Sequence, residues 1–99
     1  MKKVIWTPLS KKSLQETIDF LSETWNEEIV DDFLNQIDYR ISQIQEAPKI
    51  APLVERSKFR KLLIHKSISL FYRNYPEYIK IILIWDNRQD PAVLKKLLN

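Results

Sequence analysis

A short, almost wholly apolar run near the end of the chain places the strongest constraint on its fold. It comprises residues 79–85, Ile-Lys-Ile-Ile-Leu-Ile-Trp. The run is rich in β-branched residues and lies between two turn-forming segments, so it predicts a central strand of a sheet. It ends in a polar cluster around Arg88, and Pro91 then permits a short final helix to Leu98. Binding groups are often delivered at the end of such a strand, which makes Arg88 a candidate for function.

Two amphipathic helices are predicted before the strand. Thr7 followed by Pro8 is typical of a helix start, with threonine as the N-cap and proline at the first helical position. This helix is expected to end at about Thr24, and Asn26 to cap a second one with an acidic first turn. Apolar residues recur at helical spacing, at Leu14, Ile18, Leu21 and Trp25 and then at Val30, Phe33, Ile37, Ile41 and Ile44. The pair is expected to form an antiparallel hairpin.

Four strands are expected, at Lys2 to Trp6, Phe59 to His65, Ile68 to Tyr75 and Tyr78 to Asp86. The last three are joined by short turns and should form an antiparallel meander. We therefore expect a single α+β domain over residues 1–99. It would comprise an N-terminal strand, an antiparallel helical hairpin packed on one face of a mostly antiparallel four-stranded sheet, and a short C-terminal helix. The uncovered face of that sheet would be the natural place for function.

Two missing residue types exclude several kinds of chemistry. The 99 residues contain no glycine, which excludes glycine-rich phosphate loops and dinucleotide-binding fingerprints. They contain no cysteine, which excludes disulfides, thiol nucleophiles and cysteine-ligated metals and fits a reducing compartment. The acidic residues lack the context of metal ligands, and the N-terminus lacks an apolar signal core. We expect no cofactor, no metal, no membrane partner and a cytoplasmic location.

The net charge of +3 conceals an uneven distribution along the chain. Residues 1–55 hold six basic and ten acidic side chains, whereas residues 56–99 hold ten basic and three acidic ones. If the two parts also occupy different surfaces, one of them should attract polyanions and the other should repel them.

The order of these elements and a set of residues resemble the RelE/ParE superfamily of bacterial toxins over nearly the whole chain. The matching positions are Trp6-Thr7-Pro8, the apolar helix positions, Pro48, Arg60, Tyr72 and the run Asp86-Asn87-Arg88-Gln89-Asp90-Pro91. The resemblance implies a plasmid-stabilisation protein, the toxin half of a type II toxin–antitoxin module, which arrests growth unless a cognate antitoxin binds it. It also implies a target, DNA gyrase for ParE-type members or mRNA on the ribosome for RelE-type members, and a hetero-oligomer with the antitoxin.

The match to the RelE type is partial. Those members cut mRNA with basic residues on the middle strands and often carry a Tyr or His near the C-terminus. Here Leu62 and Ser69 stand where two more basic residues would be expected, and no Tyr or His follows Pro91. The long hairpin with Trp25 at its turn also resembles the ParE branch, so we favour a toxin that binds and poisons gyrase. A ribosome-dependent endoribonuclease and a non-toxic small basic binding domain remain alternatives, which leaves open whether the chain is an enzyme.

Candidate site residues follow from the strands and the resemblance. For a nuclease, the candidates for catalysis are Arg88, Arg60 and His65, the last because it is the one side chain that titrates near neutrality. The candidates for contact with the target or RNA are Arg60, Lys61, Arg73, Lys80 and Arg88. Strand alternation places Arg73 with Phe71, and Lys80 with Ile82 and Ile84, on one mixed basic and apolar face. Its apolar residues, which an antitoxin could cover, are Phe71, Ile82 and Ile84.

Several of these residues also have a structural interpretation. Arg88 could form an ion pair with Asp86 or Asp90 that fixes the turn before the last helix, or it could contact a phosphate or the target. His65 is more often an exposed turn residue than a catalytic one. The three tryptophans, Trp6, Trp25 and Trp85, are expected in the core.

Overall fold

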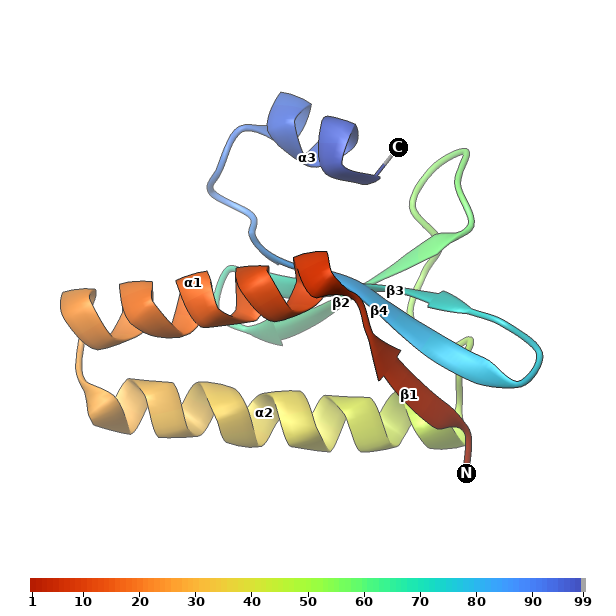
Figure 1. Ribbon diagram of the computed structural model, residues 1–99, viewed down its shortest axis with the longest axis horizontal. Coiled ribbons are helices and arrows are strands. Elements are labelled where there is room, and N and C mark those ends of the chain that lie inside the picture. The colour runs from red at the N-terminus through yellow and green to blue at the C-terminus, as the bar shows by residue number, and fades with distance from the viewer. Residues whose placement is uncertain (99) are drawn as a thin grey trace.

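The computed structural model describes residues 1–98 (Figure 1). Its elements are β1 (Lys3–Trp6), α1 (Pro8–Thr24), α2 (Glu27–Glu46), β2 (Phe59–His65), β3 (Ile68–Asn74), β4 (Tyr78–Asp86) and α3 (Pro91–Leu98). All seven predicted elements are present, and their bounds agree with the predicted ones to within a residue or two. The expected α+β architecture is confirmed. The molecule measures 38 × 31 × 22 Å along its principal axes.

The sheet has the strand order β1-β4-β3-β2, so β4 lies inside the sheet, as its apolar sequence predicts. β4 pairs with β3 in antiparallel fashion and with β1 in parallel fashion. β2 and β3 complete the antiparallel meander. The hairpin of α1 and α2 lies along one face of the sheet, and α3 lies on the side of α1 away from α2 (Figure 1).

Both long helices begin where the sequence predicts. The backbone N–H of Ser10 donates to Thr7 Oγ1 at 3.0 Å, and Pro8 occupies the first turn of α1. The backbone N–H of Ile29 donates to Asn26 Oδ1 at 3.0 Å at the start of α2. Each cap satisfies one of the backbone donors that a helix start leaves free.

The main core lies between the helical hairpin and the sheet. Fully enclosed side chains in it include Phe33 and Ile44 from α2, Leu70 and Tyr72 from β3, and Ile79 and Ile81 from β4. A buried hydrogen bond also ties α1 to the sheet, because Ser13 Oγ accepts from the backbone N–H of Ile84 at 2.9 Å.

A β-bulge interrupts the alternation of β4. Phe71 pairs with Leu83 and Tyr72 pairs with Ile81, so Ile82 is an extra residue on β4. Before the bulge the odd-numbered residues Ile79 and Ile81 face the main core, and after it the even-numbered residue Ile84 does so. Ile84 lies in the main core, while Leu83 joins Phe71 on the opposite face of the sheet.

The second face of the sheet is therefore not open, contrary to expectation. Phe71, Leu83 and Trp85 are all buried there, with 1%, 1% and 6% of their surface exposed. The partly buried residues packed on this second core are Leu9, Val54, Ile82, Leu94 and Leu98. α3 thus folds back over the sheet through Leu94 and Leu98.

Candidate functional site

The turn after β4 holds Arg88 by a forked ion pair. Its Nε donates to Asp86 Oδ1 at 3.1 Å and its Nη2 to Asp86 Oδ2 at 2.7 Å. The backbone N–H of Arg88 and the hydroxyl of Ser67 also donate to Asp86 Oδ1, at 2.9 and 3.0 Å. The sequence left two partners open for Arg88, and the structure selects Asp86.

These hydrogen bonds favour the charged form of the carboxyl. They lower the pKa of Asp86 from 3.8 to about 2, chiefly through the Arg88 side chain, against the opposing effect of burial. The Asp86 side chain is only 14% exposed, whereas that of Arg88 is 62% exposed. One edge of the guanidinium is thus fixed, and Nη1 faces solvent without a hydrogen-bond partner among residues 1–98.

A second pair of contacts fixes the rest of this turn. Asn87 Nδ2 donates to the buried hydroxyl of Ser69 at 2.7 Å, and the backbone N–H of Asn87 donates to the carbonyl of Ser67 at 2.7 Å. Asp90 then caps α3, since Ala92 N–H donates to Asp90 Oδ1 at 2.9 Å. Ser69, which stands where a basic residue was expected, is therefore a structural anchor for the turn.

A groove of about 370 Å³ lies beside Arg88. α1 forms one wall with residues that include Phe20, and Leu97 of α3 forms part of the other, while the end of β4 forms the floor. Phe20 and Leu97 are 43% and 38% exposed, so the rim is apolar on both sides. The site offers one exposed cation and two exposed apolar side chains beside a groove whose lining also contains the carboxylate of Glu16, a mixture that suits binding of a protein segment.

The other nuclease candidates do not join Arg88. Arg60 Nη1 donates to the carbonyls of Ala51 at 2.7 Å and Lys49 at 3.3 Å, and so holds the loop after α2. Arg60 pairs with Tyr72, a core residue, which places it on the helix side of the sheet.

His65 is half-buried, and its Nε2 is enclosed without a partner among the described residues. It lies across β3 from Asp86, because both residues pair with Ile68. The histidine therefore shares an end of the sheet with Arg88, but its Nε2 is enclosed within the protein.

The predicted contact residues divide between two ends of the sheet. Arg73 pairs with Lys80, whereas Ile68 pairs with Asp86, next to Arg88. Positions 73 and 68 are five residues apart on β3, which corresponds to about 17 Å at strand spacing. Arg60, Arg73 and Arg88 do not form one patch. Lys61 lies between the two ends, with its Nζ 5.9 Å from the centroid of the Phe71 ring.

The predicted apolar stripe at Phe71, Ile82 and Ile84 is wrong as an exposed surface. Phe71 and Ile82 belong to the second core beneath α3, and Ile84 is 2% exposed beneath the helical hairpin. Phe71 and Ile82 share the predicted face, but α3 covers it through Leu94 and Leu98. The bulge at Ile82 moves Ile84 to the other face, because it shifts the two-residue alternation on which the prediction rested.

Two of the three tryptophans behave as predicted. Trp85 is buried and Trp6 packs against the main core, but Trp25 is 55% exposed at the turn between α1 and α2. Lys66 Nζ lies 4.7 Å from the centroid of the Trp25 ring, a cation–π contact between this turn and the turn after β2.

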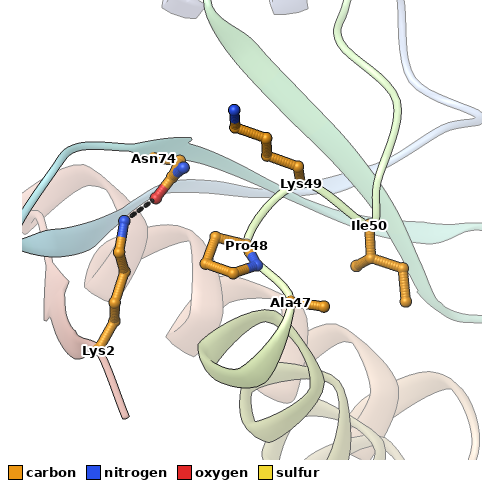
Figure 2. A pocket seen from close by; sticks show the side chains of 6 residues that line it. All are labelled: Lys2, Ala47, Pro48, Lys49, Ile50 and Asn74. Atoms are coloured by element: carbon orange, nitrogen blue, oxygen red, sulfur yellow. Dashed lines mark hydrogen bonds between the residues drawn. The ribbon is translucent and has the colours of Figure 1, made fainter.

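The opposite end of the sheet contains basic residues that the sequence did not bring together. A hollow of about 390 Å³ lies there, and Lys2 from the N-terminal segment and Lys49 from the loop after α2 both line it (Figure 2). Lys2 Nζ donates to Asn74 Oδ1 and to the carbonyl of Tyr75, both at 2.6 Å. No sequence pattern links residues 2 and 49, so only the fold reveals this grouping.

The described residues show neither a metal-binding cluster nor a membrane-spanning helix. No group of three or more His, Cys, Asp or Glu side chains among residues 1–98 could hold a metal ion. None of the helices in that part of the chain is long and apolar enough to cross a membrane.

Comparisons with known proteins agree with the fold. Residues 4–91 match the family model described as "ParE toxin of type II toxin-antitoxin system, parDE". A solved structure titled "Chromosomal ParDE TA system from P. aeruginosa" contains a chain similar to this one, with a TM-score of 0.70 and 21% sequence identity. The alignment covers 85% of this chain and 94% of that one, and at this identity it shows a shared fold. No curated protein matches the sequence.

Proposed function

Because the chain belongs to the ParE toxin family of type II toxin–antitoxin systems, we propose that it arrests growth by binding and poisoning DNA gyrase and that a cognate ParD-type antitoxin holds it inactive. The observation that carries the choice of gyrase over mRNA is that each of the three nuclease candidates is engaged or enclosed within the protein. Arg60 is bound to backbone carbonyls, His65 has an enclosed ring nitrogen, and Arg88 is paired with Asp86.

Cleavage of RNA through its 2′-hydroxyl needs a base for that proton, an acid for the leaving oxygen and positive charge on the phosphorane. Arg88 could supply the charge. No histidine or tyrosine lines the groove beside Arg88, and of the two carboxyl groups that do, Glu16 and Asp86, the second is already paired with Arg88. Binding without bond cleavage therefore fits this site better.

We assign the toxic contact to Arg88 and the apolar rim of the adjoining groove. Arg88 presents a free guanidinium edge, and Phe20 and Leu97 offer exposed apolar surface on either side. Arginine and aromatic residues are the side chains that most often dominate the binding energy of protein interfaces. The antitoxin would neutralise the toxin by covering the same rim.

The test compares the wild-type chain with Arg88→Ala in three measurements, namely growth arrest on induction, gyrase supercoiling and toe-printing of translated mRNA. The wild type should arrest growth and inhibit supercoiling without cutting mRNA. Arg88→Ala should weaken inhibition by about 10-fold or more, since a contact of this kind contributes roughly 1.4 kcal/mol or more.

Lys12→Ala is the matched control, because Lys12 is an exposed cation on α1 whose side chain is 76% exposed and whose one partner, Glu16, is 4.0 Å away. It should inhibit gyrase like the wild type. Cuts in toe-printed mRNA would replace the gyrase proposal with the nuclease alternative. Inactivity of the wild type in all three measurements would leave a non-toxic binding domain.

A further inference from the structure

Five cations converge at the end of the sheet opposite Arg88. A hollow of about 360 Å³ adjoins the one in Figure 2 and shares Lys49 and Asn74 with it. The charged residues that line the two hollows are Lys2, Lys49, Lys58, Arg60 and Arg73, and all of them are basic. They come from four segments, which are the N-terminus, the long loop, β2 and β3. We call this group the basic end.

None of these charges is neutralised by a carboxylate among residues 1–98. Lys2 donates to an amide oxygen and a carbonyl, and Arg60 donates to two carbonyls. Arg73 lies over the ring of Tyr75, 4.7 Å from its centroid. The acidic residues of the adjoining segments, Glu46, Glu55 and Glu77, line neither hollow. No carboxylate of the described residues therefore offsets the charge of the basic end, in which Lys49 and Lys58 are exposed and the other three cations are half-buried.

The acidic side chains gather elsewhere. Five of them lie around the turn between α1 and α2, at Glu23, Glu27, Glu28, Asp31 and Asp32. This turn and the basic end occupy opposite ends of the long axis in Figure 1. Separated charge of this kind orients a protein as it approaches a polyanion and speeds the encounter.

We infer that the basic end binds the sugar–phosphate backbone of double-stranded nucleic acid. Two of its cations are held in place before binding, because Lys2 and Arg60 each make two bonds to the protein. Neighbouring phosphates are the anions that such an array of fixed, unpaired cations fits.

The aromatic residues favour a duplex over a single strand. Proteins that hold single strands stack the bases on free aromatic faces. Here Tyr75 stacks on Tyr78, with ring centroids 4.8 Å apart, and also carries the guanidinium of Arg73. Its ring is therefore engaged within the protein, while the charges around it remain free.

The expected signature is a steep dependence on salt. If all five cations contact phosphates, log K falls against log salt with a slope of about −4.5, and affinity drops about 500-fold between 50 and 200 mM salt. With two contacts removed, the slope becomes about −2.7 and the drop about 40-fold.

The experiment is fluorescence anisotropy with labelled 20-base-pair duplexes of DNA and of RNA, in the absence of gyrase. The variant is Lys49→Gln with Lys58→Gln, since both side chains are exposed and neither amine makes a bond within the described chain. The control is Lys11→Gln with Lys12→Gln, which removes the same charge from two exposed cations of α1 that line neither hollow. Thermal melting checks that both variants remain folded.

The wild type should bind a duplex with the steep slope, the Lys49 and Lys58 variant should show the shallow one, and the control should match the wild type. Binding of both duplexes supports a contact with the sugar–phosphate backbone that DNA and RNA share. Binding of one duplex alone identifies DNA or RNA as the nucleic acid that the basic end binds. Equal losses in variant and control, preference for a single strand, equal competition by polyglutamate, or no binding at 50 mM salt would each overturn the inference. Because gyrase is absent, neither result depends on the gyrase proposal.

Discussion

The forked pair between Asp86 and Arg88 makes a quantitative prediction for the variant Asp86→Asn. The pKa of Asp86 is lowered from 3.8 to about 2 in the folded chain. A shift of that size corresponds to about 2.4 kcal/mol at neutral pH. Because Arg88 is 62% exposed, solvent screens part of this interaction. We therefore expect Asp86→Asn to lower the free energy of unfolding by about 1–2 kcal/mol at pH 7.

The contribution of Asp86 to stability should decrease as the pH is lowered. A carboxyl with a lowered pKa stabilises the folded chain above its unfolded value of 3.8, and this stabilisation is lost as pH falls through the folded value of about 2. About half of the contribution should remain at pH 3 and little at pH 2. Asp86→Asn should therefore approach the wild type in stability as the pH is lowered.

Urea denaturation of both proteins, followed by far-UV circular dichroism between pH 7 and pH 2.5, measures this difference. Arg88→Ala in the same series separates the exposed guanidinium from the buried bonds of Ser67 and the backbone. Its cost should shrink in 0.5 M salt, whereas the remaining cost of Asp86→Asn should not. A gap between wild type and Asp86→Asn that is absent at pH 7, or that stays constant with pH, would refute the reasoning.

Two further variants test the packing on either face of the sheet. Ser13→Ala should lower the free energy of unfolding by about 1–3 kcal/mol, measured by thermal or urea denaturation, because it leaves the buried N–H of Ile84 unpaired. Ser22→Ala loses only an exposed bond to Glu27, so it should lower the free energy of unfolding by less than about 0.5 kcal/mol. Leu94→Asp should detach α3 and expose Trp85, and a red shift of tryptophan emission would report this change. Val93→Asp is the control, because Val93 is 47% exposed and its substitution should leave the emission unchanged. The same shift in both variants would mean that Leu94 does not hold α3.

The secondary structure was predictable because its signals are local. Thr7 and Asn26 cap helices through atoms only three residues away, and the apolar spacing of α1 and α2 is set by the helical period. The apolar run of β4 requires a place inside the sheet wherever the other strands lie.

The candidate site was only partly predictable. Arg88 and Asp86 are two residues apart, so their pairing could be proposed from the sequence, and the structure confirms it. The face of Ile84 could not be predicted, because nothing in the sequence marks Ile82 as a bulge. The role of Arg60 depends on carbonyls of a loop about ten residues earlier, whose path the chain alone does not define.

The sequence by itself determined which segments are helices and strands, which of their faces are apolar, and which end of the last strand carries Arg88. These properties depend on neighbours within a turn or two of the chain. Only the tertiary structure decided that α3 covers the second face, that Arg60 and Arg73 lie far from Arg88, and that Lys2 meets Lys49 at the basic end. Those arrangements depend on contacts between residues distant in the chain, which the packing of the sheet brings together.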